Sequence, residues 1–376
     1  MTNRPGFPWI PTPTQVLLLR AILLHDDAAA RRAYDQWRSC TTFDSLDGGT
    51  ARLLPLLFLT AKSRGWHDPE TALLHARYRA AWAANTMLFR STAPYLVMLA
   101  NVGIELVLLK GAGLIDAAYG GNVGARPATD VDILVRPADA PKALAVLQAQ
   151  GFNTTVKLAF GPSKYAAYGA MNLGRGTDAQ IDLHWRLHNN ARDHRQIERM
   201  WTRRREVSFA GGPASTLDPT DHLLHAVLHG AASAAVSPCR WVADAVLLTR
   251  CSTPINWGRL LLDAAALGAV RPMQIALPLL VREFDAGIPA EVLERLERLR
   301  ADTLDRVQHW VRTGPPTRIR ESIHVATDYL ARTDGTTALA RAVHFPRYLR
   351  NTLNRGDYRM IRVLLGIAWR GPSARP

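Results

Sequence analysis

Apolar residues recur at three- and four-residue intervals along both ends of the chain, which is the spacing that lines one face of an α-helix. The pattern begins near residue 14, with Val16, Leu19 and Leu23, and continues to about residue 99. It returns after about residue 190, where we expect helices over 221–230, 241–250, 257–267 and 272–284. Both flanks of the chain are therefore predicted to be helical.

The middle of the chain follows a different pattern. Short branched or alternating apolar runs predict strands at Ile104–Leu109, Val131–Val135 and Gln180–Leu187. Between them, short helices are expected at Leu114–Tyr119 and Pro141–Gln150. The order strand, helix, strand, helix, strand predicts a small α/β unit.

Together these patterns predict an α+β protein, with a small mixed-sheet core between an N-terminal and a C-terminal helical region. The tail alternates arginines with apolar residues, as an amphipathic helix docked on the protein body would. The expected divisions are an extended arm at 1–13, a helical region at 14–99, the core at 100–190, a helical domain at 191–340 and a basic tail at 341–376.

The net charge of +14 indicates either a surface that attracts polyanions or a general preference for arginine. Only five of the 46 basic residues are lysines, which supports the second interpretation, so nucleic acid is a partner that we consider but do not favour. No apolar run approaches the roughly 20 residues of a membrane-spanning helix. The N-terminus carries no secretory signal, so we expect a cytoplasmic protein without a membrane span.

Two aspartates, Asp130 and Asp132, stand at the start of the expected strand 131–135. Residues i and i+2 of a strand face the same side, roughly 6.6–6.8 Å apart along it. Neighbouring carboxylates repel each other unless a cation lies between them, and Mg²⁺ or Mn²⁺ prefers oxygen ligands. Asp182 lies on the polar side of a later strand, where a third carboxylate would complete a two-metal site or act as a general base.

A glycine-containing turn joins the first expected strand to the helix that follows it. Glycines let the backbone approach a phosphate, and the free N–H groups of a helix start attract anions. Because nucleotidyl transfer depends mainly on metal ions, cations and alignment, this turn predicts a phosphate-binding segment. The turn consists of Leu109, Lys110, Gly111, Ala112 and Gly113.

The segments LLKGAGLIDAAYG, RPATDVDILV, QAQGF and IDLHWRL together resemble the core of an uncharacterised nucleotidyltransferase family of bacteria. That family is similar to the polymerase-beta-type nucleotidyltransferases, whose signature is a glycine-containing turn, a helix and a strand carrying Dx[DE]. The resemblance is close over about residues 95–190 and looser over 221–230 and 240–244.

The resemblance implies a nucleoside triphosphate co-substrate and Mg²⁺. It implies that Asp130 and Asp132 are metal ligands, that Asp182 is the third carboxylate, and that Gly111 lies against the triphosphate. The superfamily commonly has serine where this chain has Ala112. A hydroxyl contact to phosphate is therefore missing, unless the neighbouring lysine replaces it.

Two cations and one histidine are further nucleotide-binding candidates. Arg126, four residues before Asp130, could hold a terminal phosphate or orient the aspartates through a bidentate contact. Lys110 is expected to emerge at a strand end, and His184 shares the face of Asp182. The alternatives are a generic surface arginine at 126 and a structural histidine at 184.

His222, His225 and His229 fall at spacings of three and four on one face of an expected helix, which raises the question of a zinc site. No cysteine or other fourth ligand has suitable spacing. Packing of this helix against the core, with a few polar atoms facing the cleft, is the favoured interpretation.

The favoured hypothesis is a metal-dependent nucleotidyltransferase that moves a nucleotide from an NTP to a hydroxyl or other nucleophile of a small molecule or peptide. One alternative is a glycosyltransferase-like enzyme that holds the diphosphate of a nucleotide sugar at the same metal site. The other is a non-catalytic module of the same fold that binds nucleotide or RNA.

Overall fold

The computed structural model describes residues 9–154, 169–177, 179–187, 194–231, 239–314, 317–333 and 337–353. Two expected features are described only in part. The first eight residues of the N-terminal arm and the basic tail from residue 354 onward lie outside the described residues.

Helices fill the N-terminal region, as expected. The first begins where Thr12 and Gln15 form a reciprocal capping box with Pro13 in the first turn. Before it, Trp9 is buried, and its carbonyl accepts a hydrogen bond from Trp241 Nε1 at 2.8 Å, so the described end of the arm is docked. The elements are α1 (Pro13–Leu23), α2 (Asp27–Ser39), the 3-10 turn η1 (Phe43–Ser45), α3 (Gly48–Ala51), α4 (Leu54–Ser63) and α5 (Thr71–Asn101).

A seven-stranded mixed sheet forms the centre of the molecule, in the order β3-β4-β5-β2-β1-β7-β6. The pairs β2/β5 and β1/β7 are parallel, and the other neighbours are antiparallel. The strands are β1 (Leu106–Leu108), β2 (Val131–Val135), β3 (Asn153–Thr154), β4 (Ala170–Arg175), β5 (Ala179–His184), β6 (Arg205–Phe209) and β7 (Gly212–Thr216).

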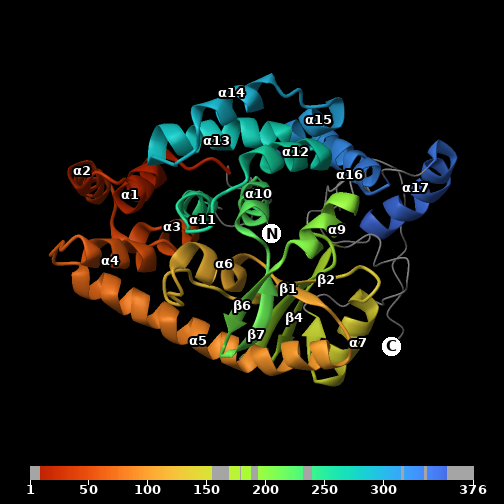
Figure 1. Ribbon diagram of the computed structural model, residues 1–376, viewed down its shortest axis with the longest axis horizontal. Coiled ribbons are helices and arrows are strands. Elements are labelled where there is room, and N and C mark those ends of the chain that lie inside the picture. Colours follow the sequence, from red (N-terminus) through yellow and green to blue (C-terminus); the bar gives the residue numbers. More distant parts are fainter. Residues whose placement is uncertain are drawn as a thin grey trace, which may run out of the picture.

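One face of this sheet is apolar and is covered by two helices. Val131 and Ile133 of β2 and Ile181 of β5 pack with the buried side of α5 and with α7 (Ala140–Ala149). At a rise of 1.5 Å per residue, the 31 residues of α5 span roughly 46 Å. This length lets α5 run from the N-terminal helices to beneath the sheet (Figure 1).

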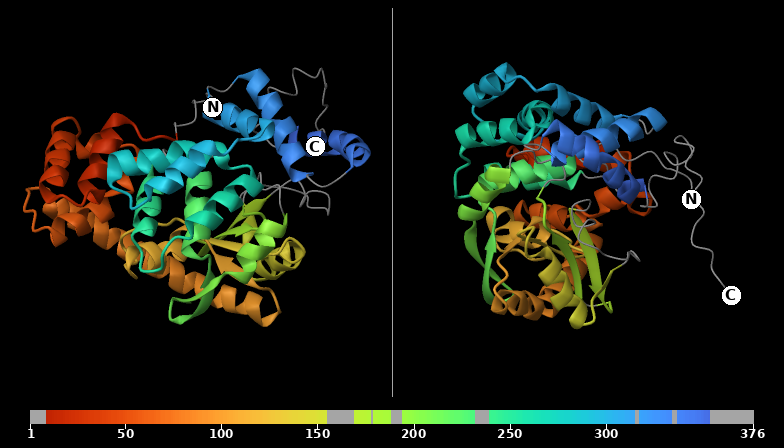
Figure 2. Two further views of the ribbon diagram at one scale, coloured as in Figure 1. Left: turned by 45° about the horizontal axis from the view of Figure 1, so that its top comes forward. Right: turned by 90° about the vertical axis from the view of Figure 1, so that its right-hand side faces the viewer.

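The opposite face of the sheet looks toward α6 (Lys110–Tyr119) and the C-terminal helices, and a second hydrophobic core lies there. The N-terminal helices and the last two described helices lie at opposite ends of the molecule (Figure 2). Tyr348, near the end of the described residues, donates a hydrogen bond to Asp328 Oδ2 at 2.6 Å, which docks α17 on α16. The C-terminal helices are α9 (His194–Thr202), α10 (Pro219–Gly230), α11 (Arg240–Thr249), α12 (Trp257–Leu267), α13 (Val270–Phe284), α14 (Ala290–Arg298), α15 (Thr303–Thr313), α16 (Arg318–Arg332) and α17 (Ala338–Leu353).

The predicted α+β class, with helical flanks on a small mixed sheet, is confirmed. The expected strands correspond to β1, β2 and β5, whereas β3, β4, β6 and β7 were not expected. The hairpin of β6 and β7 lies beyond residue 190, so the sheet extends past the expected end of the core. Ala210 and Gly211 form its two-residue turn with φ values of 50° and 87°, a backbone twist that suits a tight hairpin. No described helix has an apolar stretch long enough to cross a membrane.

One buried hydroxyl joins four elements at the centre of the fold. Thr216 Oγ1, at the end of β7, lies 2.9 Å from the carbonyl of Leu108, 3.1 Å from that of Gly113 and 2.8 Å from His222 Nε2. Burial lowers the pKa of His222 to about 4, so its ring is neutral and Nε2–H can donate to the hydroxyl while the hydroxyl donates to a carbonyl. This contact fixes α6 against β1, β7 and α10.

We expect Gly113→Ala to destabilise the fold, because a Cβ at this position would lie 2.6 Å from Leu108 O and 2.7 Å from Thr216 Oγ1. The expected loss in the free energy of unfolding is about 1–3 kcal/mol. The matched control is Gly258→Ala in α12, where the nearest atom would be 3.8 Å away, and which should be neutral or stabilising. Urea denaturation measures the free energy of unfolding of both variants. Equal stability of the two would contradict the packing argument.

Candidate functional site

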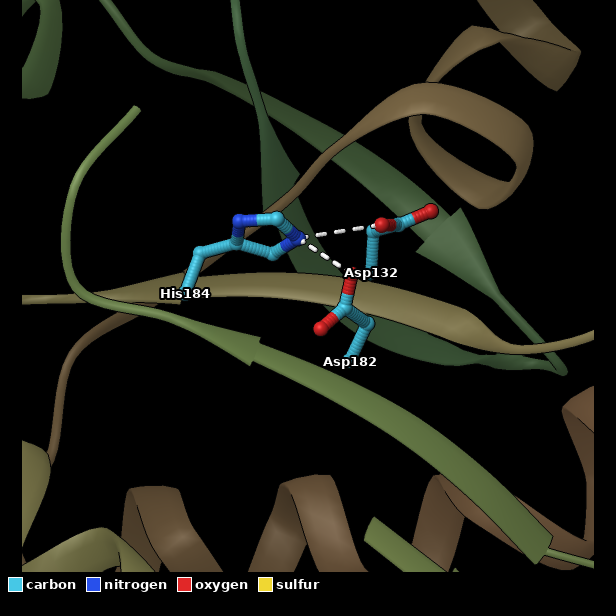
Figure 3. A group of neighbouring side chains, drawn as sticks. All are labelled: Asp132, Asp182 and His184. Carbon is cyan, nitrogen blue, oxygen red and sulfur yellow. Dashed lines mark hydrogen bonds and ion pairs between the residues drawn. The ribbon is translucent and has the colours of Figure 1, made fainter. Parts of the chain in front are cut away.

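The parallel pairing of β2 and β5 brings two of the predicted carboxylates together. Asp132 lies directly opposite Asp182 in the register of the two strands, and Leu134 lies opposite His184. Side chains opposite each other on adjacent strands share one face of the sheet. The two carboxylates and the imidazole therefore converge on the face opposite the α5 core, as Figure 3 shows.

A single imidazole nitrogen bridges the two carboxylates. His184 Nε2 lies 3.1 Å from Asp132 Oδ1 and 2.8 Å from Asp182 Oδ2 (Figure 3). All three side chains are largely buried, with exposed fractions of 7% for Asp132, 14% for Asp182 and 12% for His184. The cluster is thus a compact polar site that water reaches only in part.

Lys110 supplies a second cation to the same cluster. Its Nζ lies 2.5 Å from Asp132 Oδ1, 3.7 Å from Asp182 Oδ2 and 3.5 Å from His184 Nε2. The backbone of Lys110 is left-handed, with φ at 42°, which costs an L-residue roughly 1–2 kcal/mol. The residue is the first of α6 and is separated from β1 by Leu109 alone, so this strained turn delivers the ammonium group to the acids.

The charges of the cluster shift its pKa values in opposite directions. Burial disfavours the charged form of Asp132, but Lys110 and His184 outweigh it and hold the pKa of that carboxyl well below its usual range. Burial also opposes charge on His184, yet hydrogen bonds to Asp132 and Asp182 raise the pKa of the imidazole above its ordinary value. Each ion therefore stabilises its neighbours in the charged form.

Asp130 stands just before β2, near this cluster but outside the group of closely spaced ligand atoms. Within the described residues, its one hydrogen-bond contact is with Thr129 Oγ1, which donates to Asp130 Oδ1 at 3.5 Å. Burial, with the charges of Asp132 and Asp182, raises the pKa of Asp130 to about 6. Burial and two like charges thus favour the protonated form of this third carboxyl.

The donor set fits a divalent metal ion. One ligand atom from each of Asp132, Asp182 and His184 lies within 4.8 Å of the others, and no other described residues form such a group. Asp182 Oδ1 is buried without a hydrogen-bond partner within the described residues, so this carboxylate has a free coordination position. His184 was expected to contact nucleotide, and its position adds it to the possible metal ligands.

The predicted phosphate turn forms the first turn of α6. No side chain caps this helix, and Gly111, Ala112 and Gly113 are all buried in it. The glycine at 113 is required by packing against Leu108 and Thr216, as described above, rather than by an open approach for phosphate. Lys110 directs its ammonium group to the acids and, in this state, does not replace the missing serine hydroxyl.

Arg126 does make a bidentate contact, but its partner is Asp244, which the sequence placed in the looser part of the resemblance and did not pair with Arg126. Its Nε and Nη2 each donate to one oxygen of Asp244 in α11, at 2.8 Å, and Tyr119 donates to the same carboxylate at 2.5 Å. The guanidinium therefore does not orient Asp130 or Asp132 directly. It joins the loop before β2 to the C-terminal helices.

Sequence reasoning also missed Asn85, which is fully buried in α5. Its Nδ2 donates to the carbonyls of Val123 and Arg126 at 2.6 and 2.9 Å, and its Oδ1 accepts from Ala128 N at 2.9 Å. A polar residue on the apolar stripe of a helix was the available signal, because such groups are buried only when they are hydrogen-bonded. The amide shapes the loop that leads to the aspartates.

The histidines of α10 form no metal group within the described residues. His222 instead bonds Thr216, and the rings of His225 and His229 stack with their centroids 6.0 Å apart. The structure thus gives no support to a zinc site here and is consistent with packing of α10 on the core.

Comparison with protein families finds one whose profile matches residues 49–285, described as "uncharacterised nucleotidyltransferase". The match covers more than half of the chain and contains the whole sheet, the acidic cluster and the turn of α6. The chain belongs to this family. A search of curated proteins finds no match.

Membership of this nucleotidyltransferase family supports an enzyme of the transferase class. The matched region starts in α3 and ends just after α13. It therefore includes α5 and α11, which hold the loop before the aspartates, so these helices belong to the same family unit as the sheet.

We expect the affinity for Mn²⁺ to decrease as the pH is lowered, in a step centred near pH 6. Because the pKa of Asp130 is raised to about 6, its carboxylate is available above this pH and is lost below it. At pH 5 about a tenth of the group is ionised, so affinity should be about tenfold lower than at pH 7.5. Electron paramagnetic resonance of free Mn²⁺ measures this, and Asp130→Asn should remove the step. A step unchanged in that variant would exclude Asp130 as its source.

Proposed function

We propose that the protein is a metal-dependent nucleotidyltransferase that transfers a nucleotide from an NTP to a hydroxyl or other nucleophile of a small molecule or peptide. The observation that carries the proposal is the convergence of Asp132 and Asp182, from parallel neighbouring strands, beside the uncapped start of α6. Family membership supports the same class of reaction.

In this proposal Asp130, Asp132 and Asp182 hold Mg²⁺ or Mn²⁺, with His184 close enough to assist. When bound, the ion supplies positive charge against the phosphates. Lys110, the turn Gly111–Gly113 and Arg126 face the triphosphate, where N–H groups and cations bind phosphate oxygens. His184 contacts the nucleotide if it does not bind the ion.

The transfer forms one bond and breaks one. The acceptor oxygen attacks the α-phosphorus, the bond between the α-phosphorus and the bridging oxygen breaks, and pyrophosphate leaves with that electron pair. The proton of the acceptor hydroxyl passes to a base. Asp182 either completes the metal site or takes this proton through Oδ1, which is unpartnered within the described residues.

A nucleotide sugar is the alternative donor, because the same carboxylates would hold its diphosphate through a divalent ion. Incubation with NTPs and with sugar nucleotides, followed by mass spectrometry of candidate acceptors, distinguishes the donors by the mass that is added. A binding module without catalysis would add no mass. Calorimetry with and without Mg²⁺ then separates metal-dependent nucleotide binding from salt-dependent RNA binding.

We expect Asp130→Asn, Asp132→Asn and Asp182→Asn each to abolish transfer while the fold stays intact. Loss of a carboxylate that holds the ion removes several kcal/mol of transition-state stabilisation, which corresponds to about 10³-fold or more in rate. Asp116→Asn makes the same change at an exposed position of α6 and should retain activity. Pyrophosphate release measures turnover, and normal activity in Asp132→Asn would refute the proposal.

A further inference from the structure

Arg126 has one guanidinium nitrogen left for a ligand. The side chain is only 7% exposed, and Asp244 binds its Nε and Nη2. Nη1 makes no hydrogen bond to any described residue. It lies beside the first turn of α6, where a Cβ added to Gly111 would be 3.2 Å from it. A buried, charged group is thus aimed at the start of that helix.

The start of α6 and Nη1 present donors to the same space. No side chain caps the helix, so the N–H groups of its first residues and the positive end of its dipole are available to an anion. The absence of a side chain at Gly111 lets the guanidinium lie close to the start of the helix. Planar guanidinium donors and helix-start N–H groups are both suited to phosphate oxygens.

Asp244 and its neighbours determine where Nη1 points. Tyr119 donates to Asp244 Oδ1, and Arg240, one helical turn before Asp244, donates through Nη1 to the carbonyl of Pro127 at 2.5 Å. Burial and the charge of Arg126 lower the pKa of Arg240 to about 10, so it remains charged at neutral pH. Two arginines and one aspartate leave this region with a net positive charge.

We propose that Asp244 of α11 is a positioning residue that fixes Arg126 so that its Nη1 binds a terminal phosphate of the nucleotide at the start of α6. The inference rests on the proposed function for the identity of the ligand. The new element is that Asp244, 118 residues after Arg126 in the sequence, completes the phosphate site. Nucleotide binding would therefore depend on the docking of α11.

The test is calorimetry of the full chain in Mg²⁺ with ATP, GTP, CTP and UTP, followed by the di- and monophosphate of the tightest binder. Wild type should gain affinity with each added phosphate. Arg126→Gln and Asp244→Asn should each weaken NTP binding about 10- to 100-fold, since charge-assisted hydrogen bonds to phosphate are lost or misdirected. Both should leave NMP affinity nearly unchanged. The double variant should lose no more than Arg126→Gln alone, because Asp244 acts through Arg126.

The matched control is Asp221→Asn. Asp221 is also buried and also accepts two bonds from one arginine, Arg203, at 3.1 and 3.0 Å, but it belongs to the start of α10. Asp221→Asn should be less stable than the wild type, but its nucleotide affinity should still rise with each added phosphate. Tyr119→Phe serves if Asp244→Asn does not fold, since it removes one bond to Asp244 and retains the ion pair. It should lower NTP affinity by a smaller factor.

The outcomes separate this inference from the proposed function. NTP affinity unchanged in Asp244→Asn, or an equal loss for NTP and NMP, would overturn the positioning role even if the wild type transfers nucleotides. Phosphate-dependent affinity that is lost in the variants, without transfer to any acceptor, would support the inference and reject the proposed reaction. A wild type that binds no NTP would overturn both.

Discussion

The structure depends on how two opposed carboxylates, Asp132 and Asp182, are kept charged where water is scarce. They face each other across parallel strands, so their repulsion must be offset by cations held at the same place. Lys110 and His184 supply these cations, one from a strained turn and one from the same strand as Asp182. The left-handed backbone at Lys110 is unfavourable, and the ion pair with Asp132 offsets this strain. The same ion pair places the start of α6 beside the acids.

The loop before β2 is held from several sides, although it has little regular structure. Asn85 of α5 binds its backbone, Asp244 of α11 binds Arg126, and Arg240 binds the carbonyl of Pro127. Buried polar groups of this kind add little net stability, but removing one partner leaves the other unsatisfied. The loop therefore depends on the docking of both helices, and the family match includes both of them.

The sequence was sufficient where the relevant signal is local. Alternation identified β2 and β5 and placed Asp182 and His184 on one side of β5, whereas the pairing of the two strands is what brings Asp132 to the same face of the sheet. It was insufficient for β4, whose residues Ala170–Arg175 include a glycine and alternate weakly, and for the β6/β7 hairpin, which interrupts a region of helical periodicity. Asp244 could not be found in this way, because an acid inside a helix gives no sign of an arginine 118 residues earlier. Tertiary contacts alone define its role.

Charge balance at the site gives a reason why nucleotide affinity should require a metal ion. Without one, three carboxylates outnumber Lys110 and a protonated His184, so the region remains negative and repels a polyphosphate. A divalent cation reverses the sign of this region, and Arg126 with Arg240 already makes the neighbouring loop positive despite Asp244. The acids and the start of α6 thus form two halves of one electrostatic site. Under the proposed function, a triphosphate would therefore be attracted to both halves of the site only after the metal ion is bound.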